Sequence, residues 1–208
     1  MRTPKSTTLC VAFSERGSEL IRSLGLERIT LELLDDLTLL TLGPQLRGGN
    51  NTKIGRLANE ALFELIHTLV KHAVVQETPT RISLKNAAER KVTIAFSADP
   101  DISIVEGLSA KSRRNVVAVE IKGGGDQSNI WNRLGEAEKS HQSAKQNDFT
   151  EFWTIYNVPQ LDLKKAHEKS PTTNRFYNLR ELLVPASKDF MDFQERLTSL
   201  LSITVGPA

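Results

Sequence analysis

The spacing of apolar residues along the chain predicts that its first third is helical. Residues 18–24 and 29–42 place apolar side chains at three- and four-residue intervals, which is the period of one helix face. Gly43-Pro44 predicts the end of the second segment, and the composition of 47–51 (RGGNN) predicts a loop. From residue 52 to residue 74 one apolar stripe continues without interruption, which predicts the best-defined helix of the chain.

The middle of the chain changes to strand patterns. Residues 91–96 (KVTIAF) and 102–105 (ISIV) are short runs rich in β-branched side chains. Residues 115–122 (NVVAVEIK) are apolar at most positions, which indicates a central strand that is buried on both faces. A helix is predicted for 128–146, and a fourth strand for 149–158.

This order of elements predicts an α/β domain with a mixed central sheet flanked by helices. The sequence shows no internal repeat and no linker, so residues 1–208 are expected to form one domain. Within it we expect a helical N-terminal part at 1–75, a catalytic core at about 52–158 and a helical C-terminal part at 159–208. The best-patterned helix of that last part is 189–201.

Composition and charge narrow the class of protein. The chain is 39% hydrophobic and 25% charged, so it can build a sizeable core. A net charge of +2 argues against binding to nucleic acid through bulk charge alone but permits a basic cleft. The single cysteine excludes an intrachain disulfide and a cysteine-based zinc cluster. The longest apolar runs are too short for a membrane span or a signal peptide, so we expect a soluble cytoplasmic protein without a membrane partner.

Three ionisable residues are predicted to meet at the ends of two strands. Asp101 follows Pro100 at the start of one strand, and Glu120-Ile121-Lys122 ends the buried strand, with 18 residues between Asp101 and Glu120. Side chains alternate along a strand, so Glu120 and Lys122 share one face, and Asp101 joins them if the two strands are neighbours. Two carboxylates with few other donors favour a hard cation such as Mg²⁺, which activates water and neutralises charge on a phosphate.

Lys122 would position the attacking water or help to deprotonate it, and its charge would stabilise the transition state. The motif itself is short, and three acid-x-Lys matches occur, at 89–91, 120–122 and 162–164. The match at 120–122 stands out because it ends a buried strand pattern downstream of the chain's sole Pro-Asp. The plain alternative is a salt bridge at a strand end, with Pro-Asp as an ordinary turn.

At these residues the chain resembles the PD-(D/E)xK nuclease superfamily. Its members share a helix, a strand pair bearing Pro-Asp, a strand bearing Glu-x-Lys, and a following helix and strand, and the match covers roughly residues 52–158. The segment 120–141 (EIKGGGDQSNIWNRLGEAEKSH) is similar to type II restriction endonucleases of the XcyI/XmaI kind, which recognise a C/G-rich palindrome. The resemblance implies a restriction-endonuclease-like core and Mg²⁺-dependent hydrolysis of double-stranded DNA.

The same resemblance implies roles for individual residues. Asp101 and Glu120 would be metal ligands and Lys122 the catalytic lysine, with Asp99 as the alternative to Asp101. Many members of the superfamily add an acidic residue from the preceding helix. Glu60 is our candidate for this third ligand, and Glu64 is its alternative.

Further polar residues are candidates for contacts to DNA. A short basic loop at 111–114 could hold phosphates, and the helix at 128–146 could read base edges. The candidate residues are Arg113, Arg114, Asn129, Asn132 and Arg133. Gly123-Gly124-Gly125 would let the DNA backbone approach closely, because glycine has no side chain to obstruct it. The plain alternatives are solvated polar surface for the side chains and a tight strand-to-helix turn for the glycines.

The leading interpretation is a sequence-specific endonuclease that acts as a homodimer, since a palindromic site requires two-fold protein symmetry. Two alternatives stay open. One is a DNA repair or junction-resolving nuclease on the same scaffold, because a fold does not fix a substrate. The other is a DNA-binding module that does not catalyse and keeps the carboxylates as structure.

Overall fold

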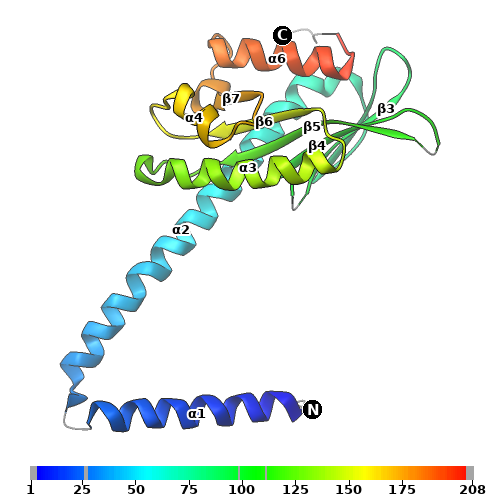
Figure 1. The fold of residues 1–208 in the computed structure, drawn as a ribbon. Helices are drawn as coiled ribbons and strands as arrows, with labels where there is room; N and C mark the ends of the chain where they lie inside the picture. The colour runs from blue at the N-terminus through cyan, green and yellow to red at the C-terminus, as the bar shows by residue number, and fades with distance from the viewer. Residues whose placement is uncertain (1–3, 26–27, 98, 111, 205–208) are drawn as a thin grey trace. The chain divides into compact units, whose positions relative to one another are not determined.

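The chain falls into two compact units, residues 1–50 and 51–208. The computed structural model describes residues 4–25, 28–97, 99–110 and 112–204. The first unit consists of helix α1 (Pro4–Leu24) and the first part of helix α2 (Leu31–Val70) (Figure 1). Several large apolar side chains of this unit are exposed, among them Val11, Phe13, Leu31 and Leu40.

The predicted helix end at Gly43-Pro44 and the predicted loop at 47–51 are wrong, because α2 runs through both as one helix. Glycine and proline disfavour a helix interior by about 1 and 3 kcal/mol per residue. However, extending an existing helix needs no new nucleation, whereas starting a second helix does. The strong helical pattern that follows residue 52 therefore continues the helix that began at Leu31.

The second unit is built on a seven-stranded sheet with the spatial order β1-β2-β3-β4-β5-β6-β7. Its strands are β1 (Val74–Thr78), β2 (Arg81–Lys85), β3 (Lys91–Phe96), β4 (Ile102–Gly107), β5 (Arg113–Lys122), β6 (Glu151–Tyr156) and β7 (Arg175–Asn178). Strands β1 to β5 form an antiparallel meander, whereas β5, β6 and β7 are parallel to one another. The sheet is therefore mixed, as the sequence predicted.

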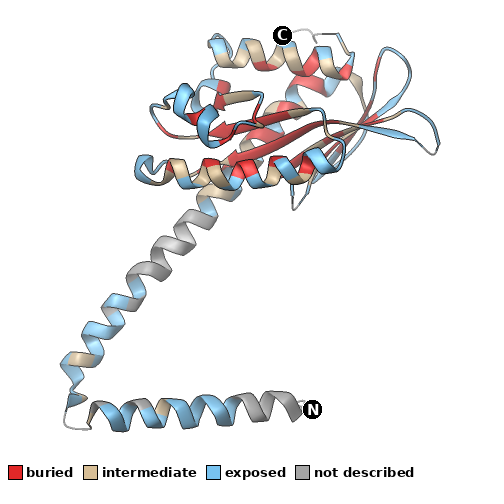
Figure 2. Ribbon diagram, viewed as in Figure 1, coloured by how far each residue is buried: buried red, intermediate tan, exposed pale blue. Residues whose placement is uncertain are grey.

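Helices cover both faces of this sheet. They are the last part of α2, α3 (Ile130–Gln146), α4 (Leu163–Lys169), the single turn α5 (Leu179–Leu182) and α6 (Lys188–Leu201), with short 3-10 turns η2 (Lys71–Ala73) and η3 (Gln127–Asn129). The main core lies between the sheet and the α2 and α6 helices, where Val119, Ile121 and Trp153 are buried. Smaller clusters under α3 and α4 cover the opposite face, so the central strands are buried on both sides (Figure 2). The predicted α/β architecture with flanking helices is confirmed.

Some elements differ from the sequence-based prediction. Arg113 and Arg114 belong to β5 rather than to a basic loop, because they pair with Gly107 and Glu106 of β4 and lengthen the hairpin; Lys111 lies outside the described residues. The C-terminal part is not only helical, since it contributes the four-residue strand β7. Strands β1, β2 and β7 are too short or too polar to show a clear period. In the described part of the chain, no helix combines the length and the apolar character that crossing a membrane requires.

Candidate active site at the end of the central strand

The pairing of β4 with β5 brings Asp101 to Glu120. Ile102 lies opposite Val119 in the antiparallel ladder, so the preceding Asp101 lies beside the following Glu120. The backbone N–H of Asp101 donates to Glu120 Oε1 at 3.3 Å, and the backbone N–H of Ile121 donates to Asp101 Oδ2 at 2.7 Å. The strand pairing on which the predicted site depends is therefore present.

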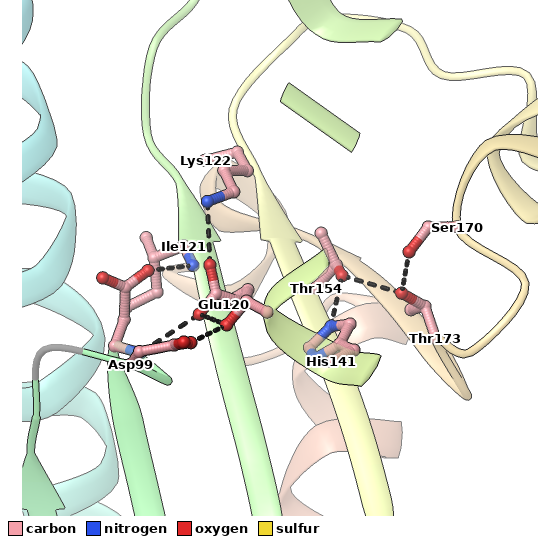
Figure 3. A network of polar contacts seen from close by, with 10 residues as sticks. Asp99, Glu120, Ile121, Lys122, His141, Thr154, Ser170 and Thr173 are labelled. Carbon is pink, nitrogen blue, oxygen red and sulfur yellow. Dashed lines mark hydrogen bonds and ion pairs between the residues drawn. The ribbon is translucent and has the colours of Figure 1, made fainter. Parts of the chain in front are cut away.

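Lys122 lies on β5, the strand that also carries Glu120, and it completes the group of three ionisable residues. Its Nζ donates to Glu120 Oε2 at 2.8 Å, and the two side chains are only 16% and 6% exposed. Ile121, between them, points to the opposite face and into the main core. The alternation along β5 thus places an acid and a base together at the margin of an otherwise apolar sheet (Figure 3).

Burial raises the pKa of the Asp101 carboxyl above its ordinary value, and the negative charge of Glu120 raises it further. The Ile121 N–H, the Lys122 ammonium and the Asn59 side chain oppose this rise. The two carboxylates therefore repel each other in a partly desolvated place, and a bound cation would relieve the repulsion.

The donor set fits Mg²⁺. Mg²⁺ retains several of its waters and is usually bound through one or two carboxylates rather than by a cage made only of protein. Asp101 and Glu120 offer two carboxylates at the margin of an open cleft. Across the ranges that the structure describes, no group of three or more His, Cys, Asp or Glu side chains could hold a metal ion by itself.

The cleft, of about 440 Å³, is bordered by α3 as well as by the strands. It is lined by Asp99, Asp101, Glu120, Lys122, Glu136, Lys139 and Ser140. The Ser140 hydroxyl donates to Glu120 Oε1 at 2.6 Å and also contacts the Asp99 carboxylate. Asp99, the alternative to Asp101, thus lies in the same cleft but reaches Glu120 through a serine that the sequence patterns do not single out.

Helix α2 approaches the site through Asn59 rather than through an acid. The Asn59 side chain hydrogen-bonds to Asp101, and the two residues line an adjoining cleft together with Glu60. Glu60 is paired with Arg56 at 3.2 Å, and its side chain is 51% exposed. Glu64 lines a different cleft, beside His67. Of the two candidate helix carboxylates, Glu60 is therefore the one that shares a cleft with Asp101.

A chain of buried polar side chains lies beside Glu120, toward β6 (Figure 3). His141, which is fully buried on α3, contacts the Thr154 hydroxyl through Nε2 at 2.9 Å, and Thr154 is the neighbour of Glu120 in the β5–β6 ladder. The contacts continue from Thr154 to Thr173 at 3.0 Å and from Thr173 to Ser170 at 2.7 Å. Burial lowers the pKa of His141 to about 4, so the imidazole is neutral at neutral pH.

The five candidate DNA contacts do not come together. Arg113 and Arg114 are at the amino end of β5, about 30 Å of extended strand from Lys122 at its carboxyl end. Arg114 is paired with Glu106 at 3.0 Å, and Arg113 lines a second depression, which shares Asp99 with the cleft of Glu120 and Lys122.

Asn129, Asn132 and Arg133 lie at the start of α3, close in sequence to the carboxyl end of β5. The side chains of Asn129 and Asn132 hydrogen-bond to each other at 3.0 Å. The guanidinium of Arg133 packs against Gly124, the middle residue of Gly123-Gly124-Gly125, called the triglycine segment below. None of these three residues lines the cleft itself, but Arg133 packs on the segment that follows Lys122.

Comparison with known proteins places this geometry in a family. Residues 1–204 match the family model described as XcyI restriction endonuclease. The chain is 48% identical over 204 residues to the type II restriction enzyme Cfr9I of Citrobacter freundii, covering 98% of this chain and 62% of that protein. It is 49% identical over 200 residues to the type II restriction enzyme XcyI of Xanthomonas campestris pv. cyanopsidis, covering 96% of this chain and 60% of that protein. The chain thus spans less than two thirds of the length of these relatives, and no solved structure gives a significant match.

Proposed function

Because this chain belongs to the XcyI restriction endonuclease family, we propose that it is a Mg²⁺-dependent, site-specific endonuclease that hydrolyses phosphodiester bonds in double-stranded DNA. The observation that carries this proposal is the convergence of Asp101, Glu120 and Lys122 at the carboxyl end of β5. Two carboxylates and an ammonium in one cleft are the groups that phosphodiester hydrolysis needs for holding a cation and for stabilising a phosphate that gains charge.

Asp101 and Glu120 would hold the metal, with Glu60 as a third candidate from α2. When bound, Mg²⁺ supplies an acidified water and positive charge for the scissile phosphate. Lys122 orients the attacking water or donates to a phosphate oxygen, since its Nζ is held within the cleft by Glu120. The hydroxyl of Ser140 and the backbone N–H of Asp101 fix the Glu120 carboxylate in the orientation that these roles require.

We further propose a C/G-rich palindromic target and a homodimer. The target follows from the similarity of 120–141 to enzymes of the XcyI/XmaI kind, and a palindrome is matched by two-fold symmetry of the protein. The large apolar side chains that the first unit exposes, such as Phe13 and Leu40, support self-association, because burying them against a partner removes apolar surface from water. Mapping of the cut ends and sedimentation equilibrium test these two points separately.

Incubation with plasmid DNA and Mg²⁺ tests the central proposal. Discrete fragments are expected from the unaltered chain. Lys122→Ala should abolish cleavage while leaving folding and DNA binding largely intact. Lys164→Ala is the matched control, because Lys164 ends another acid-x-Lys motif but is exposed and outside the cleft.

Each contrary outcome has a distinct meaning. If Lys122→Ala cleaves DNA at the rate of the unaltered chain, the proposed active site is wrong. Cutting confined to branched or damaged DNA would favour a repair or junction-resolving nuclease. DNA binding without any cutting would favour a module that binds DNA without catalysis.

A further inference from the structure

The chain segments that follow β5, β6 and β7 meet at the carboxyl ends of these parallel strands. Lys122, Tyr156 and Asn178 are level with one another in the β5–β6 and β6–β7 ladders. The triglycine segment therefore leaves the sheet beside Asn157, which follows β6, and beside Arg180, which follows β7. The carboxyl ends of parallel strands are where open α/β sheets usually bind their ligands.

Hydrogen bonds connect these three segments to one another. The Asn157 side chain donates to the carbonyl oxygen of Gly123 at 2.8 Å, and Arg180 Nε donates to Asn157 Oδ1 at 3.0 Å. Arg180 is thus anchored through Nε, while its Nη2 lies 3.8 Å from the position that a Cβ at Gly125 would occupy. One terminal nitrogen of this exposed arginine therefore lies close to the end of the triglycine segment.

Arg133 approaches the same segment from α3. A side chain at Gly124 would overlap the Arg133 guanidinium, so the arginine lies directly on the backbone there. Its Nη1 is buried and has no hydrogen-bond partner among the described residues. A buried cationic donor without a partner is unfavourable, and an anion that reaches it would satisfy it.

The nearby carboxylate of Asp126 is not the hydrogen-bond partner of the Arg133 Nη1 atom. Asp126 accepts hydrogen bonds from the backbone N–H and the hydroxyl of Ser128, at 2.9 and 2.7 Å. These bonds are the main reason that the pKa of Asp126 is below its ordinary value, and the charge of Arg133 makes the smallest contribution.

We propose that Arg133, which packs on Gly124, and Arg180, which lies near Gly125, form a subsite for a backbone phosphate of the DNA strand that is cut. The proposal rests on the proposed function and assigns Arg133 to phosphate rather than to base edges. Guanidinium groups bind phosphate oxygens in pairs of parallel hydrogen bonds, and the missing side chain of Gly124 leaves the space that the Arg133 guanidinium occupies.

The position relative to Lys122 suits a neighbouring phosphate. Gly124 is two residues beyond Lys122, which corresponds to roughly 7 Å of extended chain. One DNA strand advances about 3.4 Å along the helix axis per nucleotide. The subsite therefore lies near enough to Lys122 along the chain to take a phosphate close to the scissile one in the same strand.

The salt dependence of DNA binding separates phosphate recognition from base recognition. For a duplex of mixed sequence in buffer without Mg²⁺, the slope of log K against log salt should become shallower by about 0.9 for each phosphate that the protein no longer neutralises. Because the two arginines share one phosphate, we expect each of Arg133→Gln and Arg180→Gln to show part of this change, and the double variant to show the full change of about 0.9. Arg175→Gln is the matched control and should keep the slope, because Arg175 is at the other end of β7.

A pair of glycine variants tests the geometry without removing a charge. Gly124→Ala should displace the Arg133 guanidinium and weaken binding, because the new methyl overlaps a flexible side chain rather than the backbone. Gly135→Ala adds the same methyl to α3 with no atom within 4 Å and should bind as the unaltered chain does. Thermal melting of each variant verifies that it is folded.

The outcomes are distinct from those for the proposed function. If the unaltered chain cuts plasmid DNA and both arginine variants keep its salt slope, the subsite is wrong while the nuclease stands. If Arg133→Gln keeps the slope but cuts additional sequences, Arg133 reads a base and the subsite is overturned. If the unaltered chain neither cuts nor binds DNA, the proposed function and the subsite both fail.

Discussion

Ser140 on α3 donates a hydrogen bond of 2.6 Å to Glu120 Oε1, although the two residues are 20 positions apart in the chain. Because Glu120 is almost fully buried, this hydroxyl, the Asp101 N–H and the Lys122 ammonium together define the direction of its carboxylate.

Replacing Ser140 should therefore impair catalysis without unfolding the protein. A hydrogen bond to a charged group contributes about 1.5–3 kcal/mol, so Ser140→Ala should lower the cleavage rate by roughly 10- to 100-fold. We expect the variant to need more Mg²⁺ for half-maximal cleavage, which a purely structural role would not cause. Ser140→Thr keeps the hydroxyl and should restore much of the activity. Equal Mg²⁺ requirements in the alanine variant and the unaltered chain would contradict this positioning role.

Asp101 should lower the stability of the fold at neutral pH when no divalent ion is present. Its pKa is raised in the folded state by burial and by Glu120, so the protonated form stabilises the fold and this stabilisation is lost as the pH rises through the folded pKa. Asp101→Asn should therefore melt at a higher temperature than the unaltered chain at pH 7 and abolish cleavage. The difference in melting temperature should shrink in acid.

Mg²⁺ supplies the control for that prediction. The ion should raise the melting temperature of the unaltered chain, because it binds the folded state. It should raise that of Asp101→Asn much less. An equal rise in both proteins would show that Asp101 does not hold the ion.

His141 should contribute to acid unfolding. Its pKa is about 4 in the folded protein against an ordinary value of 6.5, mainly because of burial. The stabilisation from the neutral imidazole is therefore complete above pH 6.5 and is lost as the pH falls from 6.5 through about 4. Across that window the loss amounts to about 3 kcal/mol.

A neutral replacement isolates this effect. In His141→Gln, the free energy of unfolding measured by urea denaturation should decline less between pH 7 and pH 4.5 than in the unaltered chain. His167→Gln, which alters an exposed histidine of α4, is the comparison and should leave the decline unchanged. If the free energy of unfolding falls equally in His141→Gln and in the unaltered chain, then His141 does not cause the acid sensitivity.

Gly123, which directly follows β5, packs against α2. A side chain there would overlap the Ala58 methyl and lie 3.4 Å from the carbonyl oxygen of Ile54. Gly123→Ala should destabilise the fold by about 1–3 kcal/mol through overpacking. Adding Ala58→Gly should recover part of this loss, less the roughly 1 kcal/mol that glycine costs within a helix. A double-mutant cycle in urea measures the coupling, and additive effects would show that the two residues do not compete for space.

The site can be predicted from the sequence where the alternation of one strand is sufficient. Glu120 and Lys122 share a face because they are two positions apart in a buried strand, and this can be read without tertiary information. Asp101 required the additional assumption that β4 and β5 pair. That assumption was accessible because a short connection between two strands favours a hairpin.

Contacts from helices were not accessible in the same way. Whether α3 presents Ser140 or Lys139 to Glu120, and whether α2 presents Asn59 or Glu60 to Asp101, depends on the rotation of each helix about its axis. Apolar periodicity defines that rotation only to within a broad stripe. Arg180 was missed for a related reason, since it follows a four-residue strand whose parallel pairing brings it beside a loop 55 residues earlier in the chain.

Strand β5 pairs antiparallel with β4 and parallel with β6. The residues around its carboxyl end therefore come together through two connections of very different length. The β4–β5 hairpin closes a short loop, whereas β6 and β7 arrive only after the α3 and α4 crossovers have been ordered. Local contacts form faster than distant ones. During folding we therefore expect the paired carboxylates to form while the chain still lacks Arg180. A folding molecule would then complete the proposed cation site before the proposed phosphate subsite.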